Sequence, residues 1–151
     1  MKTNTMKRVL IALDYDPTAK RVAEVGFTMA NAMGAEIVLV HVVVDLVAYS
    51  LTYLNMGPLQ LETGIVMKDA SKQFLEKTKH HLGDMTIRTV VKEGDFADCI
   101  LETAKEENID IIVMGTHSQK WLENIVMGSV TEDVVRKSTI PMFIVPTKKR
   151  D

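Results

Sequence analysis

The chain has 151 residues, 46% of them hydrophobic, which is enough for one domain with a substantial core. Eighteen basic and twenty acidic residues give a net charge of -2, so no overall charge favours binding to nucleic acid or to an anionic membrane. Cys99 is the single cysteine, which excludes an internal disulfide, and the sequence has neither a signal peptide nor an apolar run of about 18 residues. We therefore expect a cytoplasmic protein with no nucleic-acid or membrane partner.

The first third of the chain has the pattern of a strand, a helix and a second strand. Residues 7–13 and 35–43 are short apolar runs, which are typical of strands buried on both faces. Between them, apolar residues recur at helical spacing. Asp16 and Pro17 form an N-cap and first-turn pair, and Gly34 stands where a helix C-cap belongs. These features predict a βαβ unit.

The rest of the chain repeats this alternation, with a turn at Gly94 and a helix N-cap at Asp95. In chain order the pattern predicts a connection over 45–59, a helix over about 60–82, a strand over 86–92, a helix over about 96–108, a strand over 109–114, a helix over about 130–137 and a strand over 142–145. Five strands that alternate with four helices predict an α/β fold in a single domain, residues 6–147. The sheet would be doubly wound, mainly parallel and Rossmann-like, with right-handed crossovers and helices on both faces.

Such sheets bind ligands at the carboxyl ends of their strands, near the point where the strand order reverses. Asp14 follows the first predicted strand, and Gly115 follows the apolar core of the fourth. If these two strands are neighbours, both residues lie at that point. The sequence then predicts a ligand site between them.

Residues 114–129, MGTHSQKWLENIVMGS, have the pattern of a phosphate cradle. Gly115 can take backbone angles closed to other residues as the chain leaves the strand, and Gly128 lets the main chain approach a ligand closely. Ser129 begins a Ser-x-x-Glu capping box, which predicts a helix whose first N–H groups and dipole favour an anion beside Gly128. A capping box also starts many helices that bind nothing, so helix capping alone is the alternative.

The order of these motifs strongly resembles the universal stress protein superfamily over essentially the whole chain. The resemblance rests on the strand before Asp14, His41-Val42, residues 91–95 (VKEGD), residues 111–115 (IIVMG), Gly128-Ser129 and Ile140-Pro141. ATP-binding members of that family carry Gly, two residues, Gly, nine residues, then Gly-Ser or Gly-Thr. Here the same spacing is filled by Gly115, Ser118, Gly128 and Ser129, with Ser118 in place of the second glycine.

The resemblance implies an adenine nucleotide alpha hydrolase-like fold that holds ATP or AMP, with or without Mg²⁺. By similarity, Asp14 would contact the ribose or the adenine, while Ala12 and Val42 would frame the base, whose edge the main chain of Val42 would read. Met114 and Gly115 would support the ribose and the first phosphate. The phosphates would be surrounded by backbone N–H groups and hydroxyls of His117, Ser118, Gly128, Ser129, Val130 and Thr131.

The residues alone also allow simpler roles. Asp14 is alternatively a cap of the turn into the first helix, and Val42 and Met114 are alternatively core residues. Cys99 is expected to be packed rather than nucleophilic, because no basic neighbour is evident to lower its pKa. The histidines have no partner at ligand spacing, so no metal site is expected. There is no Gly-x-x-x-x-Gly-Lys loop, Ser-His-Asp pattern or carboxylate pair, so no catalytic residue is assigned.

Three functions follow from the resemblance. The first is an adenine-nucleotide-binding stress-response protein that acts as a dimeric switch rather than as a fast enzyme. The second is a nucleotide-free dimeric interaction module, which the Ser118 replacement favours, and the third is a slow ATPase. In each, the homodimer would form along the last strand, from Pro141 to Val145, because this apolar stretch carries no charge and ends at a sheet edge.

Overall fold

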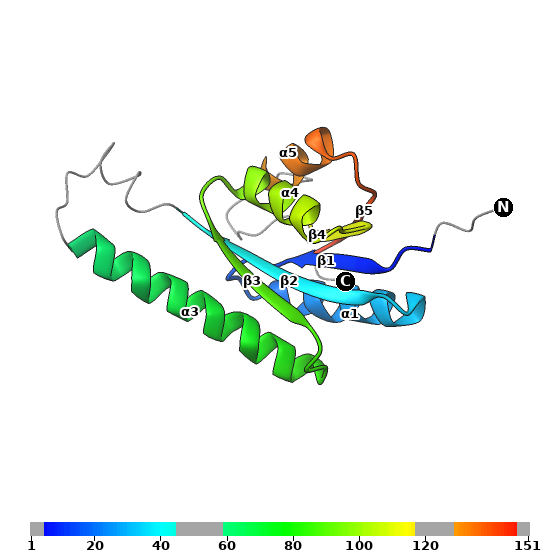
Figure 1. Cartoon of the computed structure of the whole chain (residues 1–151), viewed down its shortest axis with the longest axis horizontal. Helices are drawn as coiled ribbons and strands as arrows, with labels where there is room; N and C mark the ends of the chain where they lie inside the picture. The colour runs from blue at the N-terminus through cyan, green and yellow to red at the C-terminus, as the bar shows by residue number, and fades with distance from the viewer. Residues whose placement is uncertain (1–4, 45–58, 117–128, 148–151) are drawn as a thin grey trace.

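The computed structural model describes residues 5–44, 59–116 and 129–147 (Figure 1). Within them, strands and helices alternate as predicted. In chain order they are β1 (Arg8–Ala12), α1 (Ala19–Met33), β2 (Glu36–Val43), α3 (Leu59–Leu82), β3 (Arg88–Glu93), α4 (Phe96–Glu106), β4 (Ile111–Gly115), α5 (Ser129–Lys137) and β5 (Met142–Val145).

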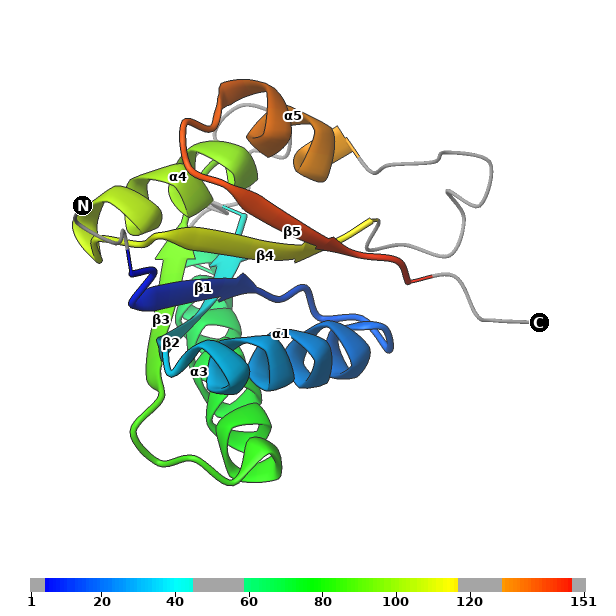
Figure 2. The same cartoon turned by 90° about the vertical axis from the view of Figure 1, so that its right-hand side faces the viewer.

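The five strands form one sheet in the order β3-β2-β1-β4-β5, and every neighbouring pair is parallel. The sheet is therefore entirely rather than mainly parallel. β1 and β4 are neighbours, with Val9 opposite Ile111 and Ile11 opposite Val113. The point at which the strand order reverses thus lies between these two strands, and their carboxyl ends meet at one edge of the sheet (Figure 2).

Helices cover both faces of the sheet, with α1 and α3 on one face and α4 and α5 on the other (Figure 1). Two apolar clusters fill the spaces between these layers. One includes Leu39 and Leu75 on the α1 and α3 face, and the other includes Val40 and Ile100 on the α4 and α5 face. A sheet buried on both faces explains why the strands are continuous apolar runs rather than alternating ones. The structure thus confirms the predicted fold class.

The boundaries of α1 differ in part from the prediction. The helix ends as expected at Gly34, whose φ of 65° is left-handed and whose N–H bonds back to Ala30 and Asn31. It begins at Ala19, with Thr18 as its N-cap, so the predicted N-cap at Asp16 was wrong by two residues. The Asp16 carboxylate instead accepts a hydrogen bond from the Thr18 N–H at 2.6 Å and closes the turn before the helix.

The strand β4 begins two residues later than predicted because the end of α4 uses those residues. Asn108 has a φ of 53°, and the Ile109 N–H donates to the Ala104 carbonyl at 2.9 Å. This left-handed ending closes the helix before the chain can extend. Among the described residues, no helix has both the length and the apolar character that a membrane span requires.

Candidate functional site

The predicted ligand site lies at the carboxyl edge of the sheet. β1 ends at Ala12 and β4 ends at Gly115, and these strands are adjacent. β2, on the other side of β1, brings Val42 to the same edge. Asp14 lies in the turn after β1, where its side chain is exposed. The described residues predicted to meet the base and the ribose therefore do converge.

Four of the predicted site residues share one packing environment. Ala12, Val42, Met114 and Val130 all belong to the apolar cluster beneath α4 and α5. Val42 and Met114 are each only 6% exposed. Their side chains are thus core residues, as the alternative interpretation held, and a ligand at this edge would meet their main-chain groups.

A hydrogen bond joins the start of α5 to the end of β4. The Thr131 hydroxyl donates to the Gly115 carbonyl at 2.9 Å, and Thr131 is only 4% exposed. Because a hydroxyl has a single hydrogen, this bond uses the donor that the resemblance would assign to a phosphate. Thr131 therefore holds the first turn of the helix against the strand.

Gly115 is a glycine because of close packing. A Cβ built on it would lie 2.9 Å from Val22 Cγ2 and 2.9 Å from Thr147 Cγ2. Its φ is not among the positive values, which occur among described glycines at Gly34, Gly83 and Gly94. The expectation that Gly115 needs unusual backbone angles was wrong, since the crowding of α1 and the segment after β5 excludes a side chain there.

The segment after β5 forms part of this edge, which sequence reasoning missed. The Thr116 and Thr147 hydroxyls lie 3.0 Å apart, and the Thr147 N–H donates to Thr116 Oγ1 at 3.2 Å. Arg21 Nε, from α1, donates to the Pro146 carbonyl at 2.8 Å. In the sequence, a threonine shortly after each of two strands is only a weak indication of a shared site. The two threonines come together because β4 pairs with β5.

Three residues of the predicted cradle, His117, Ser118 and Gly128, lie outside the described residues. Ser129 is the first helical residue of α5, so the helix begins one residue earlier than the start at about Val130 that a capping box on Ser129 predicts. The Glu132 carboxylate accepts a bond from Arg136 one turn further along at 2.6 Å. The contacts of the cradle itself remain predictions.

His41 is a buried polar group close to this edge. It is 7% exposed, and its Nδ1 lies 2.7 Å from the Leu13 carbonyl oxygen. Phe74 of α3 meets the imidazole edge-on, with 5.7 Å between ring centroids, and Tyr15 meets Phe74 in the same way at 5.2 Å. The sequence signal was a single polar residue within an apolar strand.

The described residues contain no group of three or more His, Cys, Asp or Glu side chains placed to hold a metal ion. Cys99 is 7% exposed, and burial raises the pKa of its thiol, as do the nearby carboxylates Glu102 and Asp95. A raised pKa keeps the thiol protonated and therefore a poor nucleophile.

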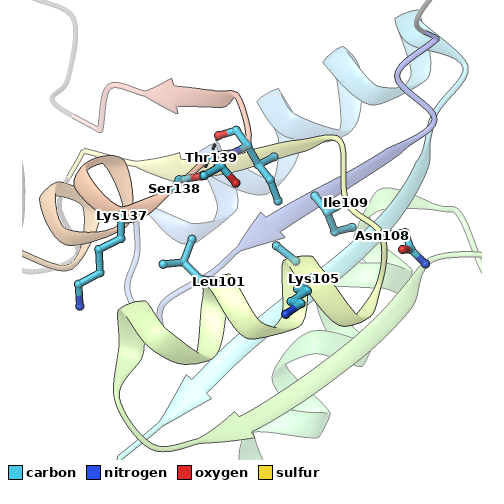
Figure 3. Close-up of a pocket in the computed structure, with 9 residues that line it drawn as sticks. Leu101, Lys105, Asn108, Ile109, Lys137, Ser138 and Thr139 are labelled. Carbon is cyan, nitrogen blue, oxygen red and sulfur yellow. Dashed lines mark hydrogen bonds between the residues drawn. The ribbon is translucent and has the colours of Figure 1, made fainter.

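A separate groove of about 500 Å³ lies at the opposite, amino edge of the sheet, between α4 and the connection from α5 to β5 (Figure 3). Its polar groups are largely engaged locally. The Ser138 hydroxyl exchanges hydrogen bonds with Ile140 at 2.8 and 2.9 Å, and Lys137 Nζ lies 3.4 Å from Asp98. It is distinct from the predicted site and shows no arrangement that selects a ligand.

The sheet order, and the start of a helix beside the β1/β4 switch point, define a doubly wound α/β protein of the adenine nucleotide alpha hydrolase-like class. Residues 5–146 match the model of the Universal stress protein family, and the chain belongs to this family.

Similar proteins cover almost the whole chain. Universal stress protein MJ0577 of Methanocaldococcus jannaschii is 26% identical over 94% of this chain and 96% of its own length. The solved structure of MJ0577 has a TM-score of 0.80 over 97% of this chain and 99% of that chain.

Two further solved structures of similar fold contain nucleotides. A universal stress protein in complex with cAMP is 18% identical, with a TM-score of 0.65 over 96% of this chain and 100% of that chain. The universal stress protein from Archaeoglobus fulgidus in complex with dAMP is 17% identical, with a TM-score of 0.62 over 93% of this chain and 98% of that chain.

Proposed function

We propose that this protein binds ATP or AMP, with or without Mg²⁺, at the carboxyl edge of β1 and β4 and acts in the stress response as a cytoplasmic, nucleotide-dependent switch. The observation that carries the proposal is the 2.9 Å bond from the Thr131 hydroxyl to the Gly115 carbonyl. This bond holds the start of α5 against the end of β4. Helix N–H groups and the positive end of the dipole then face the place where phosphates would sit.

The adenine and ribose would occupy the neighbouring part of the edge. Val42 is buried, so its main chain would read the base, and Asp14 is exposed in the next turn, where its carboxylate can accept a ribose hydroxyl. The complexes of similar proteins with cAMP and dAMP support this class of ligand, since both molecules combine adenine with one phosphate.

We further propose that two copies pair through β5. The sheet has two edge strands, and their chemistry differs. β3 carries Arg88 and Lys92, which pair with Glu107 at 2.9 Å and Glu106 at 2.8 Å, whereas residues 142–145 carry no charge. Charged edges discourage strand pairing, so β5 is the edge suited to a partner. A two-fold axis would place the two β5 strands antiparallel.

Two other functions are compatible with the fold. Ser118 in place of a signature glycine favours a nucleotide-free interaction module, because serine resists the positive φ that glycine accepts. For an ATPase, the sequence lacks the lysine-containing phosphate loop of fast phosphoryl-transfer enzymes, so we expect any hydrolysis to be slow.

The proposal is tested by titrating the purified, nucleotide-free protein with ATP, AMP, cAMP and GTP in a calorimeter, with and without Mg²⁺. We expect the adenine nucleotides to bind and Gly128→Val to abolish binding, because a side chain there would fill the space that a phosphate needs. The control is Ala32→Val, which also introduces a valine side chain but on the exposed side of α1.

Two results would contradict the proposal. A folded wild-type protein that binds no adenine nucleotide, and from which none is released on denaturation, would favour the interaction module. A folded Gly128→Val variant with unchanged affinity would move the phosphates away from the start of α5. Restoring glycine at Ser118 should keep or tighten ATP binding, and a loss of affinity would make the serine hydroxyl a direct ligand.

A further inference from the structure

We propose that His41 is a positioning residue for the adenine end of the nucleotide site, where it fixes the turn that presents Asp14. The expected effect of His41 on nucleotide binding rests on the proposed function. Its role in fixing the turn rests only on contacts among described residues.

Leu13, the residue before Asp14, is tied to β2 through both of its main-chain groups. Its N–H donates to the Val40 carbonyl at 2.9 Å, and its carbonyl lies 2.7 Å from Nδ1 of His41. The first bond continues the ladder between β1 and β2. The second is made by a side chain, just where β1 has ended.

The chemistry of the second bond sets the tautomer of His41. A carbonyl oxygen can only accept, so Nδ1 must carry the hydrogen and donate it. The peptide group that follows is planar, so the Leu13 carbonyl and the Asp14 N–H point in opposite, fixed directions. Holding the carbonyl therefore sets the direction in which the chain enters Asp14.

The imidazole is itself held in place. His41 is 7% exposed, and Phe74 packs edge-on against it at 5.7 Å between centroids. Tyr15, which follows Asp14 directly, contacts the same Phe74 at 5.2 Å. Phe74 thus contacts both His41 and Tyr15, but Tyr15 is 77% exposed, so the two hydrogen bonds of Leu13 are the main attachment of the turn.

This arrangement explains a polar residue in the middle of the core. Ile37 and Leu39 precede His41 at alternate positions of β2 and fill the cluster beneath α1 and α3. A leucine at position 41 would continue that cluster but would leave the Leu13 carbonyl without this donor. We assign Asp14, which follows Leu13, to the ribose and Val42, which follows His41, to the base. The imidazole N–H of His41 therefore lies where it can order the adenosine end of the site.

The test compares three variants with the wild type. His41→Phe keeps an aromatic ring and removes the donor, while His41→Asn places an amide N–H near the position of Nδ1. His80→Phe makes the same chemical change at an exposed residue of α3 and is the matched control. Two properties are measured, namely amide hydrogen exchange of the unliganded protein over residues 13–16, and affinity for ATP, AMP and tripolyphosphate.

We expect His41→Phe to speed exchange in residues 13–16 and to weaken ATP and AMP by about tenfold, the usual effect of losing one such hydrogen bond. Tripolyphosphate, which lacks adenosine, should bind with unchanged affinity. His41→Asn and the control should resemble the wild type in both measurements. A residue that only stabilised the fold would weaken all three ligands together and would not be rescued by asparagine.

The proposal is overturned if exchange in residues 13–16 is the same in the wild type and in His41→Phe, or if tripolyphosphate weakens as much as ATP. If the phenylalanine variant does not fold, His41→Gln replaces it, since its amide lies one carbon further out and misplaces the donor. If the wild type binds no adenine nucleotide, the proposed function fails, and the exchange measurement still decides whether His41 fixes the turn.

Discussion

At the scale of single residues, the candidate site is built by side chains that hold main chain in place. The Thr131 hydroxyl bonds to the Gly115 carbonyl, and the His41 imidazole bonds to the Leu13 carbonyl. Each bond joins a side chain to the residue at or just after the end of a strand. The geometry of the edge therefore depends on a few buried donors, and the apolar residues around them supply rigidity.

Gly115 provides a test of packing at this edge. Gly115→Ala should lower the free energy of unfolding by about 1–3 kcal/mol, because the added methyl would meet Val22 and Thr147 at 2.9 Å. Denaturation in urea measures the change. The substitution Thr147→Ser removes the crowding methyl group and keeps the hydroxyl, so the double variant should lose less stability than the sum of the two single changes. Strict additivity would contradict the close contact.

At the scale of elements, helix α4 shows that a local signal can be read directly from sequence. Asp95 was predicted as its N-cap, and in the structure its carboxylate accepts the Asp98 N–H at 2.9 Å. The adjacent Gly94 has a φ of 141° and links β3 to this cap. The cap depends on residues within one turn of the helix, whereas the Gly94 N–H also donates to the Val43 carbonyl of β2 at 3.0 Å.

Removing the cap should destabilise the protein without changing the site. We expect Asp95→Ala to cost about 1 kcal/mol of unfolding free energy, and Asp95→Asn to restore most of it, since an amide oxygen accepts the same bond. Thermal and urea denaturation measure both variants. Asp69→Ala, at an exposed position of α3, is the control and should be close to neutral. An equal loss in the asparagine and alanine variants would show that the carboxylate acts through its charge instead.

At the scale of the whole molecule, the two edge strands of the sheet, β3 and β5, differ in charge, and this difference bears on how two copies would assemble. β3 is bordered by ion pairs, and β5 offers an uncharged edge on which Phe143 is 39% exposed. β5 also leads directly into Pro146 and Thr147, which pack behind the candidate site. The proposed dimer strand is thus followed directly by two residues that pack against the candidate site.

The dimer proposal predicts that Phe143→Lys converts the protein to a monomer, because a charge on β5 would be buried between two copies. Light scattering after size-exclusion chromatography measures the mass. Phe96→Lys is a matched control, since Phe96 is 38% exposed but lies at the start of α4. If Phe143→Lys and Ile144→Lys both remain dimers, the interface lies elsewhere.

The sequence by itself determined the elements and their order. The apolar runs, the glycine at the end of α1 and the aspartate before α4 act within a few residues, where backbone angles and local hydrogen bonds decide the outcome. These signals gave the fold class and the family resemblance. They also placed Asp14 and Gly115 at one end of the sheet, on the condition that β1 and β4 are neighbours, whereas Ala12 and Val42 were added by the family resemblance.

The tertiary structure alone decided how that edge is held together. Thr131 and Gly115 are 16 residues apart, His41 and Leu13 are 28 apart, and Thr147 and Thr116 are 31 apart. No local pattern selects such pairs, because which hydroxyl or imidazole meets which carbonyl depends on strand order and on how closely helices pack against the sheet. For the same reason, the sequence suggested only that Gly115 is needed for its backbone freedom. In the structure, a glycine is needed at this position because any side chain would collide with Val22 and Thr147.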